Sequence, residues 1–209
     1  MTGTRDLPEI IVEPIVRRAL EEDLGLAGDV TTNAVVAATT KARTAIKARH
    51  AGTVAGLQPA LMAFRLIDPT LKIKIGKADG AWVSDGETIA TIEGSAKSLL
   101  TAERVALNFL GHLSGVATMT TRLVEAVHTA GANVKTRVTC TRKTTPGLRA
   151  LEKQAVLLGG GFNHRFSLAD AILIKDNHVA AAGGVAAALK AARGAAGHMV
   201  QIEIEVDTQ

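Results

Sequence analysis

The sequence predicts an α/β protein whose two parts are built differently. In residues 1–95, helical patterns alternate with short predicted strands. Apolar and basic side chains alternate along these strands, which favours an antiparallel sheet with one exposed face. From residue 132 onward, strands and helices follow one another regularly, and such repeating units pair their strands in parallel. The second part is therefore expected to be an open parallel sheet or a piece of a barrel.

The composition is that of a globular protein and narrows the choice of partners. Hydrophobic residues make up 47% of the 209 residues and charged residues 21%. Aromatic residues make up only 2%, with no Tyr, which argues against a nucleic-acid surface that stacks bases. The net charge of +4 is spread along the chain and favours small anions as partners. The start of the chain lacks a signal segment and no apolar run reaches transmembrane length, so we expect a cytoplasmic protein without a membrane partner.

Several common types of site are missing from the sequence. A single cysteine, Cys140, excludes a disulfide framework and a cysteine-based zinc site. The chain also lacks a Gly-x-x-x-x-Gly-Lys phosphate loop, a Gly-x-Gly-x-x-Gly turn, a His-Glu-x-x-His motif and a Gly-x-Ser-x-Gly elbow. These absences exclude the P-loop, dinucleotide-dehydrogenase, zinc-protease and serine-hydrolase classes.

The first part of the chain begins with a predicted amphipathic helix over residues 7–24. Its apolar residues recur at three- and four-residue steps, although Pro14 requires an early kink or a later start. A turn rich in Gly and Asp follows, in which Asp29 and Thr31 are expected to cap or turn the chain. The next predicted elements are a strand at 44–49, a helix at 56–67, a strand at 71–75, and a hairpin at 82–92 around Asp85-Gly86.

The longest helical pattern covers residues 98–130, and Gly111 and Gly115 are possible interruptions. Arg104 lies off its apolar stripe, so spacing alone makes it a solvent-facing cation. His112 and His128 are expected to be packing or surface residues rather than ligands.

The second part is predicted to alternate strands and helices. Thr145 and Pro146 have the residue types of a helix cap and first helical position, and Gly159 of a helix stop. The predicted elements are a strand at 134–141, a helix from Pro146 to Gly159, a strand at 171–175, a helix at 184–196 and a strand at 200–207.

The last strand places Glu203, Glu205 and Asp207 on one face and apolar residues on the other. A polar face is unusual in a strand covered by helices, since unpaired carboxylates are not buried. The strand is therefore expected to line a barrel or a substrate crevice, or else to be a solvent-facing edge strand.

Cations gather where the apolar runs of the second part meet loops. Arg142, Lys143, Arg165 and Lys175 stand at such strand ends, where binding sites are usually built. Arginine suits planar carboxylates and lysine suits phosphates, so these residues predict a pocket for a strongly anionic small molecule. His164, beside Arg165, either donates to that anion or has a structural role.

Along nearly its whole length the chain resembles the quinolinate phosphoribosyltransferases, enzymes of NAD biosynthesis. The resemblance is carried by EDLGLAGDVTT at 22–32, AERVALNFLGHLSGVAT at 102–118, TRKTTPGLR at 141–149, GGGFNHR at 159–165, LIKDNH at 173–178 and EIEVD at 203–207. It implies an N-terminal α/β sandwich domain over residues 1–115 and an incomplete parallel β/α barrel over residues 116–209.

The resemblance also implies a reaction and a set of site residues. Quinolinate and phosphoribosyl pyrophosphate would give nicotinate mononucleotide, pyrophosphate and carbon dioxide with Mg²⁺. The residues at the matching positions are Arg142, Arg165 and Lys175 for the quinolinate carboxylates, with His164 beside them; Lys143 for the phosphoribosyl donor; Glu205 for the ribose or its metal; and, in a homodimer, Arg104 for the neighbouring subunit's site. Lys143 and Glu205 are the expected catalytic residues.

Members of this family are longer than this chain, and the part beyond Gln209 would complete the barrel. Two other functions also stay open. One is a phosphoribosyltransferase of the same fold, of the type linked to molybdate transport, with another acceptor. The other is an inactive truncated chain that only binds anions or dimerises.

Overall fold

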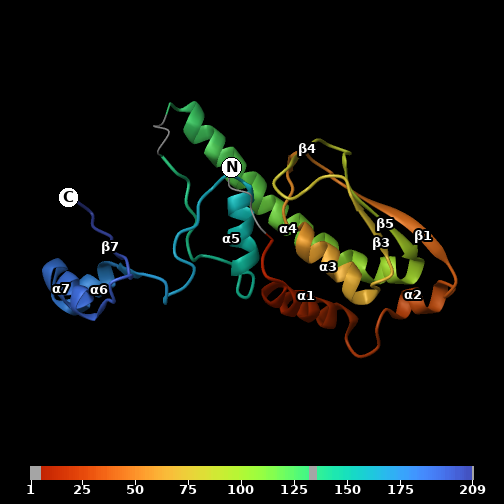
Figure 1. Cartoon of the computed structure of the whole chain (residues 1–209), viewed down its shortest axis with the longest axis horizontal. Coiled ribbons are helices and arrows are strands. Elements are labelled where there is room, and N and C mark those ends of the chain that lie inside the picture. The colour runs from red at the N-terminus through yellow and green to blue at the C-terminus, as the bar shows by residue number, and fades with distance from the viewer. Residues whose placement is uncertain (1–5, 132–135, 209) are drawn as a thin grey trace. The chain divides into compact units, whose positions relative to one another are not determined.

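The computed structural model describes residues 6–131 and 136–208, which fall into the units Met1–Asn163 and His164–Gln209 (Figure 1). Each unit is described by itself. The helices of the first unit are α1 (Glu9–Leu24), α2 (Val30–Val35), α3 (Leu57–Ile67), α4 (Ala96–Thr129) and α5 (Arg149–Leu158). Its strands are β1 (Lys41–Lys47), β2 (Gly52–Thr53), β3 (Lys72–Ile75), β4 (Trp82–Val83) and β5 (Thr88–Ser95).

Helix α1 confirms the first predicted helix. It buries Val12, Val16 and Leu20, which follow one another at four-residue steps. Pro14 lies inside the helix rather than before its start, at the cost of one backbone hydrogen bond. The expected capping role of Asp29 is also confirmed, because its Oδ1 accepts a hydrogen bond from the Thr32 backbone N at 2.9 Å. Bonds from Thr32 hold the pKa of Asp29 below its usual value.

The predicted hairpin at 82–92 is wrong. The turn forms, with Gly86 at φ +76°, but β4 pairs with β2, and β5 lies in the middle of the antiparallel sheet β1-β5-β3. Ile92 of β5 is paired with Thr44 on one side and Ile73 on the other, so both edges of β5 are already occupied. The segments that form β2 and β4 therefore pair with each other.

Helix α4 runs through the first unit without a break. Gly111 and Gly115 do not interrupt it, although glycine inside a helix costs about 1 kcal/mol relative to alanine. Packing of α4 on α3, α5 and the strands offsets that cost, and Leu113 is among the most deeply buried side chains. The predicted domain division between residues 115 and 116 falls inside this continuous helix. The division stays a prediction.

The expected strand at 134–141 is wrong for the residues that the structure describes, while 134 and 135 lie outside them. Residues 136–141 contain a single parallel β-bridge between Thr139 and Phe162. Its bonds run from Phe162 N to Val138 O at 2.8 Å and from Cys140 N to Phe162 O at 3.0 Å. The chain then turns away, so the ladder does not extend.

Helix α5 starts later than predicted and ends where predicted. Residues 146–148 form a turn, with Leu148 N bonded to Thr145 O at 3.0 Å, and the helix begins at Arg149. Gly159 ends it. A Cβ on Gly159 would lie 2.4 Å from the Ala117 carbonyl oxygen of α4, so only glycine allows this close approach.

The second unit contains a parallel pair of strands joined through helices. Its elements are β6 (Ile172–Ile174), α6 (Asp176–Ala182), α7 (Val185–Ala195) and β7 (Ile202–Ile204). Strands β6 and β7 are parallel, with Ile172 opposite Ile202, which confirms the predicted parallel pairing. The α/β class is confirmed, while closure into a barrel stays an expectation of the resemblance. None of the described helices is both long and apolar enough to cross a membrane.

Asp79 makes the stability of the first unit depend on pH. Burial raises the pKa of its carboxyl to about 6, despite the hydrogen bond that the carboxylate accepts from Leu57 N at 3.0 Å. The folded state thus holds this proton more tightly than the unfolded state. The contribution of Asp79 to stability is therefore largest below about pH 4 and falls by at most about 3 kcal/mol as pH rises through 6.

We therefore expect Asp79→Asn to unfold at a higher denaturant concentration than wild type at pH 7 and at an equal one at pH 4, because asparagine still accepts from Leu57 N. Urea denaturation at both pH values measures the difference. The exposed Asp85→Asn serves as the control. An equal response of both variants to pH would contradict the assignment.

Candidate anion-binding site

The loop at 140–148 carries two of the predicted site residues, Arg142 and Lys143, and local hydrogen bonds shape it. The Lys143 backbone N donates to Thr141 Oγ1 at 3.1 Å, and Thr144 N donates to Arg142 O at 3.1 Å. Arg149 Nε, in the first turn of α5, donates to Thr144 Oγ1 at 3.1 Å. The loop is therefore fixed to α5 immediately beyond its two cations.

Lys143 lines a small cavity of about 250 Å³, which is room for a carboxylate- or phosphate-sized group. The charged side chains around it are Lys143, Lys153 and Glu152. Lys153 is 2% exposed, and its Nζ donates to Cys140 Sγ at 2.9 Å. Cys140, to which the sequence assigned no role, thus partners a buried lysine.

Glu152 is the buried acid of this region. One carboxylate oxygen accepts from Thr145 N at 3.0 Å and the other lies 2.8 Å from His112 Nε2. Burial raises the pKa of Glu152, but the bonds from Thr145 and His112 outweigh it, and the pKa lies below its usual value. Glu152 is therefore an anion, and it ties α4 to the cation-bearing loop.

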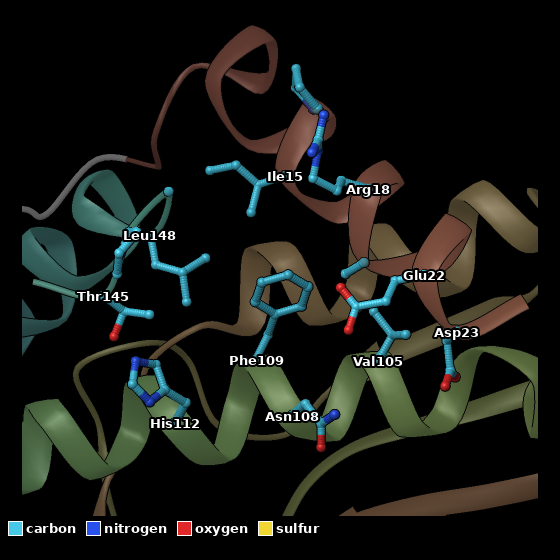
Figure 2. A pocket seen from close by; sticks show the side chains of 14 residues that line it. Ile15, Arg18, Glu22, Asp23, Val105, Asn108, Phe109, His112, Thr145 and Leu148 are labelled. Carbon is cyan, nitrogen blue, oxygen red and sulfur yellow. The ribbon is translucent and has the colours of Figure 1, made fainter. Parts of the chain in front are cut away.

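A larger groove of about 720 Å³ lies between α1, α4 and residues 145–148 (Figure 2). Its apolar lining includes Ile15, Val105, Phe109 and Leu148. Its polar lining residues are Arg18, Glu22, Asp23, Asn108, His112 and Thr145. His112 and Thr145 lie at one end of the groove and Asp23 at the other (Figure 2).

Arg104 is exposed on α4, as its spacing predicts. Asn108 and His112 follow it at four-residue steps, so the three side chains lie along one exposed row of the helix. Asn108 and His112 also line the groove between α1, α4 and residues 145–148, whereas Arg104 does not.

In the second unit, the carboxylates predicted on the last strand have basic partners. Lys175 Nζ donates to both oxygens of Glu205, at 2.8 and 3.0 Å. His164 Nε2 lies 3.0 Å from a Glu203 oxygen. These side chains are between 32% and 61% exposed, so the polar face of the strand is open to solvent and to a ligand.

Arg142 and Arg165 share an unusual feature. In the described part of the chain, the Nε atom of each is buried and has no hydrogen-bond partner, while Arg165 Nη1 donates to Ala171 O at 2.9 Å. A buried donor left unpaired costs about 1–3 kcal/mol. A ligand oxygen would reach either Nε only after the neighbouring side chains moved, so this feature marks the two arginines, each in its own unit, as candidates for anion binding.

Within residues 6–131 and 136–208, no three His, Cys, Asp or Glu side chains gather as a metal site would require.

Two family models cover most of the chain. One, described as quinolinate phosphoribosyl transferase, N-terminal domain, matches residues 29–114, and the corresponding C-terminal domain model matches residues 116–209. The structure of NadC from Streptococcus pyogenes is 42% identical, with a TM-score of 0.92 over 98% of this chain and 70% of that one. The probable nicotinate-nucleotide pyrophosphorylase [carboxylating] of Bacillus subtilis (strain 168) is 45% identical over 90% of this chain and 63% of its own length.

A third relative is the nicotinate-nucleotide pyrophosphorylase [carboxylating] of Mycobacterium leprae (strain TN), 44% identical over 92% of this chain and 67% of its own length. The fold and the matched motifs thus define a two-domain chain of the phosphoribosyl transferase class. Within that class, the chain belongs to the quinolinate phosphoribosyl transferase family. It spans from about half to two thirds of the length of the first curated relatives.

Sequence reasoning singled out the cations Arg142 and Lys143 but gave no role to the buried charges beside their loop. Glu152 and Lys153 lie in the helical pattern that follows, and they are 7% and 2% exposed. The sequence offers one signal of this burial. Glu152 and Lys153 directly follow the apolar Leu151, and a helix that packs on one face cannot turn all of its successive residues to solvent.

The pairing of Glu205 with Lys175 is exposed and should contribute little to folding. We expect Glu205→Gln to change the free energy of unfolding by at most about 1 kcal/mol, as for other surface ion pairs. Chemical denaturation beside Glu203→Gln measures this. A much larger loss would mean that Glu205 is a structural residue and would count against a role in ligand binding.

Proposed function

We propose that this chain binds quinolinate and phosphoribosyl pyrophosphate and acts in the transfer that forms nicotinate mononucleotide, pyrophosphate and carbon dioxide, a step of NAD biosynthesis. The observation that carries the proposal is the buried, unpaired Nε atom on both Arg142 and Arg165, within motifs that the family models match. The names of the related proteins favour quinolinate as the acceptor over the molybdate-linked alternative.

In this proposal the basic residues divide between the two substrates. Arg142, Arg165 and Lys175 hold the quinolinate carboxylates, with His164 beside them, since the arginine fork matches a planar carboxylate. Lys143 lines a cavity of phosphate size and meets the donor's phosphates. Glu205, currently paired with Lys175, faces the ribose.

The proposed reaction requires electrostatic stabilisation of developing charge and does not require a nucleophile from the protein. The bond between ribose C1 and pyrophosphate breaks, and the leaving group keeps the electron pair. The quinolinate ring nitrogen bonds to C1, and a carboxylate such as Glu205 stabilises the positive charge that develops on the ribose. The ring then loses its 2-carboxylate as carbon dioxide, and a proton takes its place.

Mg²⁺ is part of the proposal. The cation is usually held by one or two carboxylates together with substrate phosphates, and the 52% exposed, oxygen-donating side chain of Glu205 fits that limited requirement. When bound, the ion would offset the charge of the departing pyrophosphate.

We further propose a cytoplasmic homodimer in which Arg104 reaches the partner's site. Its exposure on α4 leaves it accessible to a second subunit, which supports this arrangement.

Binding tests the proposal without requiring turnover. Quinolinate is expected to bind the 209-residue chain more tightly than nicotinate, because the second carboxylate adds charge-assisted bonds. Arg142→Ala or Arg165→Ala should weaken quinolinate binding about ten- to a hundredfold in calorimetry. Arg193→Ala, exposed on α7, should leave it unchanged. Unaltered affinity in both site variants would refute the assignment.

Site sharing can be tested by mixing variants. Arg104→Ala and Lys175→Ala should each bind quinolinate poorly. After mixing and subunit exchange, roughly a quarter of the sites should be restored, because mixed two-fold dimers carry one intact site. Calorimetric stoichiometry reads this out. A mixture that stays as weak as its parents would show that Arg104 does not act across subunits.

A further inference from the structure

The carboxylate of Glu152 joins two elements that are distant in sequence. Glu152 lies on α5 and is 7% exposed as a residue, and each of its two carboxylate oxygens has a hydrogen-bond partner. One lies 2.8 Å from His112 Nε2 on α4, and the other accepts from the Thr145 backbone N at 3.0 Å. Thr145 follows Arg142 and Lys143 in the same loop, so this carboxylate determines where the loop stands relative to α4.

Glu152 also lines the small cavity that Lys143 lines. An unscreened carboxylate in that position would repel an incoming anion and compete with it for Lys143. The hydrogen bonds from His112 and Thr145 occupy both carboxylate oxygens, which offsets part of the charge of Glu152 and orients the side chain.

His112 is reachable from outside, unlike the carboxylate it contacts. Its side chain is 43% exposed and lines the large groove, whereas the side chain of Glu152 is 10% exposed (Figure 2). Thr145 lines both the groove and the small cavity. The contact between His112 and Glu152 therefore connects the groove with the anion cavity.

We infer that His112 and Glu152 form a positioning couple for the Arg142–Lys143 loop, and that anion binding in the Lys143 cavity depends on it. His112 is a positioning residue here, since it acts through Glu152. The inference rests on the proposed function only for the identity of quinolinate as one of the anions.

The test replaces His112 in two ways. His112→Phe removes the nitrogen that meets Glu152, while His112→Gln offers an amide N–H of similar reach. Asn108→Ala, one turn earlier in the same groove, is the matched control. Two quantities are measured in each variant: the hydrogen-exchange rate of the Thr145 amide by NMR, and the affinity for quinolinate and for inorganic pyrophosphate by calorimetry.

We expect His112→Phe to speed Thr145 exchange and to weaken binding of both anions about tenfold, the scale of one hydrogen bond to a charged group. His112→Gln should restore both quantities to near wild type, and Asn108→Ala should leave them unchanged. If the Phe variant does not fold, His112→Ala takes its place in the comparison with His112→Gln.

Each other outcome also decides the question. Unchanged Thr145 exchange in His112→Phe would overturn the inference, and so would faster exchange with unchanged affinity, because the contact would then be structural only. If wild type binds pyrophosphate but not quinolinate, and the variants follow the expected order, the couple stands and the proposed acceptor falls. If wild type binds neither anion, both fall.

Discussion

The first unit depends on one row of hydroxyl side chains along α4. Thr118 Oγ1 accepts from the Thr53 backbone N at 2.9 Å, and Ser114 Oγ accepts from Ala55 N at 3.0 Å. Thr121 Oγ1 lies 2.8 Å from Thr53 Oγ1. These bonds let the helix satisfy backbone groups of the 53–55 segment that no sheet partner takes, because β2 is only two residues long. The long helix thus connects the sheet, α5 and the cation-bearing loop.

The proposed site follows from that organisation. At 34 residues, α4 is about 50 Å long, and its successive faces contact the sheet, α3 and α5. Arg104 and His112 project from its exposed row, while α5 presents Glu152 and Lys153 toward the loop. The chemistry of anion binding is supplied by loop residues, and their geometry is set by two packed helices.

The periodicity of the sequence predicted the longer helices well, since apolar residues at every third or fourth position mark a buried face, but it did not predict the short helices α2 and α6. The pairing of strands was not predictable in the same way: β5 forms beside β1 and β3 through contacts far apart in the chain, which overrides the hairpin signal at Asp85-Gly86. The contact between His112 and Glu152 spans 40 residues and leaves no local pattern. Arg142 and Lys175 were predicted because a cation after an apolar run is a local signal, and of the two only Lys175 directly follows a strand, β6.

Gly159 sets the spacing between the two helices that matter most. Its missing side chain lets the end of α5 touch the backbone of α4, with the Ala117 carbonyl where a methyl group would stand. Any larger residue there would push α5 outward and carry Glu152 and Lys153 with it. A substitution of Gly159 would therefore displace two residues that line the anion cavity. One added carbon atom would then impair folding and ligand binding together.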